Sequence, residues 1–167
     1  MRGPQVSGDL RAAGLAEQAV LVAGALGRDV DVVTPTGARA KADVAVEGQK
    51  VTRVSVEVGA GDPLDERVLR SYAIGAAHMA LGWVLSEALT VDSETGEIYD
   101  LTIRSFGVLR AADTPAVDVT IVDADGPPLA HSSDAVFAAV AAATWNALGC
   151  PDTFPVRRAA AEEGMAQ

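Results

Sequence analysis

The stretch Asp62–Leu89, DPLDERVLRSYAIGAAHMALGWVLSEAL, decides the expected fold. Asp62 suits the N-cap of a helix, Pro63 suits its first position, and the acidic residues that follow favour its first turn. Charged residues are few between Arg70 and Glu87, so the predicted helix over residues 62–89 is central and buried on most sides. The apolar residues at three- and four-residue steps, the spacing of one helix face, are Val68, Leu69, Tyr72, Ala76, Met79, Ala80 and Trp83.

Two glycines, Gly75 and Gly82, lie two turns apart inside this predicted helix. A glycine in a helix interior costs about 1 kcal/mol relative to alanine. We therefore expect another backbone or a bound group to lie close against that side of the helix. Together with Met79 and Trp83, the two glycines are candidates for an interface.

The rest of the chain alternates predicted strands with two further helices, and we expect residues 1–8 to be disordered. A helix over Asp9–Leu26 comes first, followed by strands at 29–33, 42–47 and 51–58, the last two joined by a hairpin turn at Gly48-Gln49. Strands at 98–106 and 117–122 follow the central stretch, then an Ala-rich helix over 133–148 capped by Ser132 or Ser133, an edge strand at 154–156 and a mobile tail at 158–167.

This order of elements predicts an α+β fold with a largely antiparallel sheet. The long glycine-containing helix and the second, Ala-rich helix are expected to pack on one face of that sheet. The length of 167 residues suits a single domain, over residues 9–157. The pattern leaves open whether the 9–26 helix packs in the same core.

Composition excludes several classes of function. The net charge of −10 argues against nucleic acid and against an anionic membrane surface as partners. Cys150 is the only cysteine, so the chain cannot form an internal disulfide or hold an iron–sulfur cluster with its own thiolates. The N-terminus lacks the apolar core of a signal peptide, and we find no apolar run of about 18 residues. We therefore expect a cytoplasmic protein.

No residue pattern points to a metal or to a nucleophile. His78 and His131 are far apart and lack neighbouring ligands, and His78 is better explained as a hydrogen-bonded histidine of the core or of an interface. No nucleophile elbow is present, and Ser132 and Ser133 are better explained as helix caps. Cys150 follows a predicted helix end, where the helix dipole disfavours a thiolate.

Phosphate and acid–base sites are equally unsupported. The segment 59–62 precedes a predicted helix N-terminus, but the acidic residues there would repel an anion, and a tight turn explains it better. Asp123 and Asp125, which precede two prolines, are better explained as a solvated turn than as an acid–base pair.

An ordered set of motifs does carry a resemblance. A hairpin precedes Asp62-Pro63, and the glycine-containing helix ends in WVLSEAL (83–89). The segment FGVLRAADTP (106–115) follows, and then Pro127-Pro128-Leu129 precedes the Ala-rich helix. From Val44 to Arg157 the chain thereby resembles the C-terminal region of the molybdopterin-binding large subunit of xanthine dehydrogenase and aldehyde oxidase-type molybdenum hydroxylases.

The departures from this family concern its chemical residues. Tyr72 stands where the resemblance places a glutamine that approaches the pterin cofactor, and Ala76 and Ala80 replace two glycines of the family's helix motif. Gly126 stands at the position of the family's catalytic glutamate. The resemblance therefore implies no catalytic residue here, and the candidates for cofactor binding are Tyr72, Gly75 and Gly82.

Three hypotheses follow from the sequence. In the first, the chain is a small non-catalytic relative that acts as an accessory subunit or scaffold in a xanthine dehydrogenase-like complex. It would then bind no cofactor by itself, and molybdopterin would lie in a partner subunit. In the second, the chain completes a split molybdopterin site in such a complex. In the third, it is a self-associating binding module unrelated to molybdenum.

Overall fold

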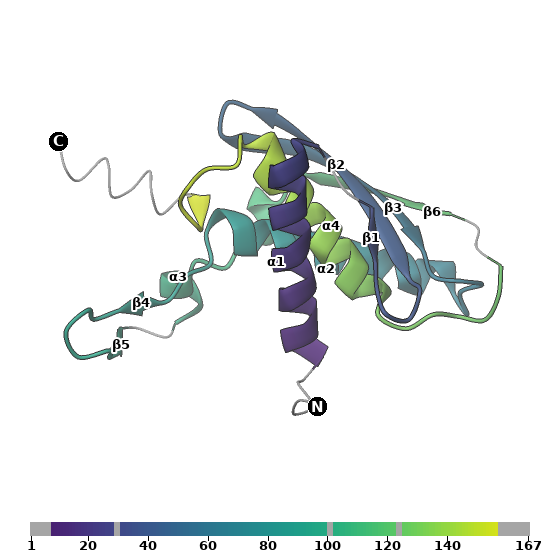
Figure 1. The fold of residues 1–167 in the computed structure, drawn as a ribbon, viewed down its shortest axis with the longest axis horizontal. Helices are drawn as coiled ribbons and strands as arrows, with labels where there is room; N and C mark the ends of the chain where they lie inside the picture. Colours follow the sequence, from purple (N-terminus) through teal and green to yellow (C-terminus); the bar gives the residue numbers. More distant parts are fainter. Residues whose placement is uncertain (1–7, 29–30, 100–101, 123–124, 157–167) are drawn as a thin grey trace.

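The computed structural model describes residues 8–28, 31–99, 102–122 and 125–156 (Figure 1). It confirms the predicted α+β class with a mostly antiparallel sheet. Gly8 is the first residue of α1, whereas residues 1–7 and 158–167 lie outside the described residues. The elements are α1 (Gly8–Leu26), β1 (Val32–Val33), β2 (Arg39–Glu47), β3 (Lys50–Gly59), α2 (Glu66–Leu85), β4 (Thr90–Val91), β5 (Ile98–Tyr99), α3 (Ile103–Phe106), a 3-10 turn (Ala111–Asp113), β6 (Ala116–Ile121) and α4 (Ser132–Ala147).

The main sheet has the strand order β1-β2-β3-β6. The first two pairings are antiparallel, and β6 joins β3 in parallel. Glu47 pairs with Lys50, which confirms the predicted hairpin turn at Gly48-Gln49. Valines of β3 are buried on one face of the sheet, whereas the opposite face carries polar residues, including an Arg53–Asp118 ion pair of 2.6 Å between β3 and β6. One face of the sheet is therefore the core face.

The Ala-rich helix α4, and not the 62–89 helix, lies at the centre of the fold (Figure 1). It packs against α1, α2 and the strands β1, β2 and β3. Nine of its residues are buried, and most of them are alanines. Small side chains let neighbouring backbones approach closely, so this helix can serve as a shared contact for all of these elements. Ala16, Ala19 and Ala23 of α1 belong to the same hydrophobic core, which answers the question that the sequence left open.

The predicted bounds of the 62–89 helix are wrong, and its predicted face is only partly buried, because Leu69, Ala76 and Ala80 face the core while other members of that face do not. Helix α2 begins only at Glu66, because Asp65 and not Asp62 is its N-cap, accepting hydrogen bonds from the amides of Arg67 (2.8 Å) and Val68 (3.4 Å). The side that faces the core is rich in alanine, and larger apolar side chains at the predicted face are exposed. The buried residues are Leu69, Ala73, Ala76, Ala77, Ala80, Leu81, Gly82, Val84 and Leu85, whereas Val68, Tyr72 and Met79 are exposed.

By length and hydropathy alone, α2 could cross a membrane. Half of its apolar window is buried inside the described structure. One helix of this length and hydropathy is weak evidence for a membrane span.

The predicted strand at 98–106 is also wrong. Ile98 and Tyr99 form β5, which pairs only with β4 in a separate two-stranded sheet. Thr102 then caps α3 through a capping box with Ser105, so the backbone turns into a helix at Ile103. We call residues 90–99 the β4–β5 arm, because Figure 1 shows this hairpin projecting away from the rest of the molecule.

Two further predictions near the C-terminus fail. Residues 154–156 form no strand, and the Phe154 ring instead packs on Trp83 and Trp145, with ring centroids 4.6 and 5.5 Å apart. The N-cap of α4 is His131, in the left-handed conformation with φ 65°, so Ser132 and the next serine are the first residues of the helix. The N-cap therefore lies at least one residue before the serines that were expected to cap the helix.

Hydrogen bonds to Asp92 close the tip of the β4–β5 arm. Its Oδ1 accepts from the amides of Glu94 and Thr95, both at 2.8 Å, and the Tyr99 hydroxyl donates to Oδ2. The hydrogen bond from Tyr99, followed by those from the two amides, lowers the pKa of Asp92 from 3.8 to about 2. A lowered carboxyl pKa stabilises the folded arm above about pH 3.8, and that contribution is lost as the pH falls through about 2.

We expect Tyr99→Phe to raise the pKa of Asp92, because it removes the hydrogen bond that contributes most to lowering that pKa. An NMR pH titration of the Asp92 carboxyl carbon measures this shift. Tyr72→Phe is the matched control, since Tyr72 lies on α2 and is exposed there. An Asp92 pKa that is the same in wild type and Tyr99→Phe would contradict the assignment.

Candidate functional site

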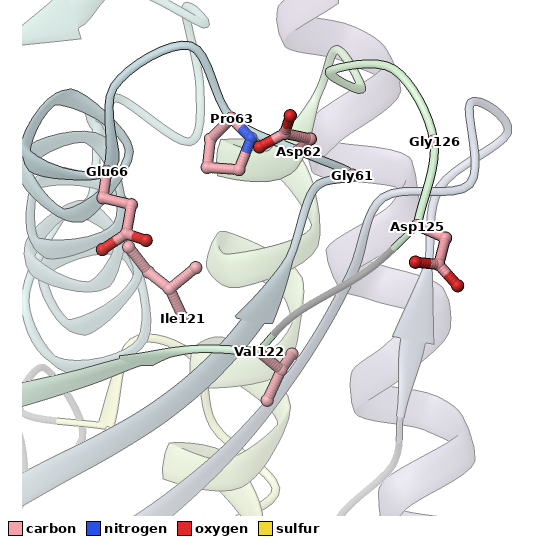
Figure 2. Close-up of a pocket in the computed structure, with 8 residues that line it drawn as sticks. All are labelled: Gly61, Asp62, Pro63, Glu66, Ile121, Val122, Asp125 and Gly126. Atoms are coloured by element: carbon pink, nitrogen blue, oxygen red, sulfur yellow. The ribbon is translucent and has the colours of Figure 1, made fainter.

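A cleft of about 380 Å³ lies where β6 ends and α2 begins (Figure 2). It is the part of the described structure that contains Gly126, the position at which the resemblance places a catalytic glutamate. The residues that line it are Gly61, Asp62, Pro63, Glu66, Ile121, Val122, Asp125 and Gly126.

Backbone hydrogen bonds fix the shape of this cleft. The Asp62 amide donates to the Gly126 carbonyl at 3.0 Å, and the Leu129 amide donates to the Ala60 carbonyl at 2.8 Å. Gly61 has φ +69° and lies so close to the other segment that a Cβ there would overlap the Pro127 carbonyl oxygen. The loop after β6 is therefore held directly against the loop between β3 and α2.

The described side chains of the cleft do not form an acid–base pair or a metal site. Asp62, Glu66 and Asp125 are exposed, and in Figure 2 their carboxylates point in different directions. Among the residues that the structure describes, no group of three His, Cys, Asp or Glu could hold a metal ion. Asp123, the other half of the predicted Asp123–Asp125 pair, lies outside the described residues. Three carboxylates around the cleft would also repel an anionic cofactor.

An exposed apolar stripe on α2 carries three of the candidates that the sequence predicts. We call Val68, Tyr72, Gly75 and Met79 the α2 outer face; their spacing of four, three and four residues places them on one side of the helix. Tyr72 is 63% exposed and Met79 is 60% exposed. A Cβ added at Gly75 would meet nothing within 4 Å, so no described residue makes the close approach expected there.

Gly82 lies in a different environment, although it belongs to the same helix. It is buried, and a Cβ there would overlap Glu87 Oε1. The close approach expected at Gly82 is thus made by a side chain of the chain itself. Burial raises the pKa of Glu87, and the nearby His78 opposes this shift.

His78 and Trp83 both have partners inside the chain. His78 Nδ1 lies 2.8 Å from Thr114 Oγ1, which confirms that His78 is a hydrogen-bonded histidine. Trp83 is half-buried, and its ring packs on Phe137 and Phe154 with centroids 5.6 and 4.6 Å apart. Trp83 was a candidate for an interface, and these contacts within the chain already cover part of its ring.

A second cleft, of about 440 Å³, was not predicted from the sequence. It lies between α1 and the start of α4, and His131 and Asp134 line it with a separation of 3.1 Å between Nδ1 and Oδ2. The i,i+3 spacing of His131 and Asp134 was a visible signal, but their proximity to Gln18 of α1 depends on the fold. Cys150 is half-buried, and its Sγ lies 3.9 Å from Asn146 Oδ1.

Comparison with known proteins finds sequence similarity to a molybdenum-binding subunit. It is 32% identical over 110 residues to the aldehyde oxidoreductase molybdenum-binding subunit PaoC of Escherichia coli K12, and equally to the same subunit of Escherichia coli O157:H7. The alignment covers 60% of this chain and 15% of the length of those subunits. Part of this chain is homologous to a segment of a molybdenum-hydroxylase large subunit. The resemblance found in the sequence motifs is therefore confirmed.

Two solved structures share the fold of part of this chain. Quinoline 2-oxidoreductase from Pseudomonas putida 86 superposes with a TM-score of 0.53 at 16% identity, over 59% of this chain and 13% of that one. The Cu,Mo-CO dehydrogenase superposes with a TM-score of 0.50 at 14% identity, over 64% of this chain and 14% of that one. No protein-family model matches the chain.

Proposed function

We propose that this chain is a non-catalytic relative of the molybdenum-hydroxylase C-terminal domain and acts as an accessory subunit or scaffold. It would dock against a molybdenum-containing subunit through the α2 outer face. The observation that carries the proposal is that this face is apolar and exposed on a chain homologous to one segment of a much longer subunit.

The energetics of the α2 outer face favour a partner. Complete burial of a large apolar side chain stabilises a complex by roughly 1.5–3 kcal/mol. Tyr72 and Met79 are both large and mostly exposed, and Gly75 between them leaves room for a partner backbone. Contiguous exposed apolar residues of this kind are typical of protein–protein contacts.

The geometry at Gly126 supports a non-catalytic role. Gly126 has φ +105°, a conformation that residues with side chains rarely adopt. A glutamate at this position would therefore be strained unless the backbone changed. The carboxylates that do line the cleft are exposed, and a tuned general base needs a more buried setting. Because the cleft residues do not fit an anionic pterin cofactor either, molybdopterin would belong to the partner subunit.

Capture experiments test the docking. The tagged chain, expressed in its native host, is expected to retain a molybdenum-containing subunit, identified by mass spectrometry and metal analysis. We expect Tyr72→Glu/Met79→Glu to weaken this binding at least about tenfold, because two charges would be buried against the partner. Leu21→Glu is the control, since Leu21 is 73% exposed on α1 and lies off the α2 outer face.

Failure of the wild-type chain to retain any molybdenum-containing subunit would contradict the docking proposal. Equal binding by wild type and Tyr72→Glu/Met79→Glu would place the contact elsewhere. The non-catalytic role is tested separately with Asp125→Asn in the captured complex. Unchanged turnover by the molybdenum-containing subunit of that complex supports the non-catalytic role. A loss of its turnover with unchanged binding would favour a split active site.

A further inference from the structure

The β4–β5 arm carries apolar side chains that no described core covers. Its two strands have two residues each and pair only with each other among the described strands. Isolated two-stranded hairpins are at best marginally stable in water. The apolar residues on and beside the arm are between 44% and 75% exposed; they are Leu89, Val91, Ile98, Tyr99 and Ile103.

The charge of the arm is of one sign. From Glu87 to Tyr99 the sequence contains acidic residues and no Lys or Arg. Asp92, Glu94 and Glu97 carry these charges on the arm itself, where Glu94 and Glu97 are exposed. A partner that accepts the arm therefore needs an apolar floor and basic residues around it. A second copy of the chain, with its own net charge of −10, would bring like charges together.

We propose that the β4–β5 arm inserts into an apolar groove with a basic rim on the molybdenum-containing subunit. This inference rests on the proposed function and adds the element that makes a second contact, apart from the α2 outer face. The apolar side chains of the arm supply buried area, and its carboxylates steer the encounter and fix its orientation. The hydrogen bonds at Asp92 favour the folded tip before binding, which lowers the entropy lost on association.

Two variants test the two components of this contact with the purified molybdenum-containing subunit as the probe. Val91→Thr/Ile98→Thr removes apolar surface but keeps β-branched residues in the strands. Glu94→Lys/Glu97→Lys reverses the charge. We expect each to weaken binding at least about tenfold. Binding by the wild-type chain should also weaken as the salt concentration rises, because salt screens exposed charges.

The control is Glu47→Lys/Glu57→Lys, which makes the same change in net charge on the polar face of the main sheet. It is expected to bind within about twofold of wild type, and thermal unfolding checks that all variants are folded.

Each outcome separates this inference from the proposed function. If wild type captures no molybdenum-containing subunit, both fall. If the arm variants bind as tightly as wild type, the proposed function stands and the arm inference is overturned. If wild type forms a dimer in light scattering that the arm variants abolish, the arm binds a second copy and the inference is also overturned.

Discussion

Ala142→Leu in α4 is expected to destabilise the protein by about 3 kcal/mol, near the upper end for overpacking of a core. Ala142 is 0% exposed, on a helix that packs against α1, α2 and the main sheet at once. Protein interiors are close-packed, so three added carbon atoms need space that neighbours on several sides would have to give. A chain of this length should show a fall in Tm of roughly 10 °C.

Thermal and urea unfolding of Ala142→Leu measure this effect, and Ala25→Leu is the matched control. Ala25 is an exposed alanine of α1, where the same substitution adds the same atoms without entering the core. The control is expected to change the free energy of unfolding by no more than about 0.5 kcal/mol. Similar unfolding free energies for the two variants would show that α4 is not the tightly packed centre of the fold.

The central position of α4 also shows what the sequence could not predict. Alternating strands, the Gly48-Gln49 turn and the α+β class follow from local patterns, and the structure has them. Which helix lies at the centre depends on how the helices and the sheet pack together in three dimensions. An alanine-rich helix has weak amphipathic contrast, so its pattern does not indicate how many neighbours it contacts. The predicted face of α2 mixed alanines with large apolar residues, and the spacing alone did not show that its alanines would be buried against α4 while Tyr72 and Met79 stay exposed.

For the candidate site too, some features can be predicted from the local sequence, whereas others depend on contacts between distant segments. The position of Gly126 next to two prolines is visible in the sequence, and the resemblance assigns it to the family's glutamate. Gly75 and Gly82 have the same residue type and the same helical setting, yet one is open and the other is covered by Glu87. That difference depends on how the chain turns after α2. The β4–β5 arm was missed because residues 98–106 have apolar positions typical of a strand, whereas Thr102 starts a helix within them.

Gly61→Ala is expected to lower the free energy of unfolding by about 3 kcal/mol or more, through two effects that add. Gly61 has φ +69°, and the left-handed conformation costs a residue with a Cβ roughly 1–2 kcal/mol. The added Cβ would also overlap the Pro127 carbonyl oxygen, which is backbone and cannot rotate away. Separating the two segments would strain the hydrogen bonds from Asp62 to Gly126 and from Leu129 to Ala60, each worth about 1 kcal/mol.

Gly48→Ala separates these two effects, because Gly48 has φ +62° but a Cβ there would meet nothing within 4 Å. It should therefore show only the conformational cost, about 1 kcal/mol, and the difference between the variants in urea unfolding measures the contact with Pro127. Equal losses in the free energy of unfolding for both substitutions would show that the loop before α2 is not held against the segment after β6. The cleft beside Gly126 could then open. A cleft that opens could bring Asp62 and Asp125 into new positions, and the argument from fixed geometry against acid–base chemistry there would lose its basis.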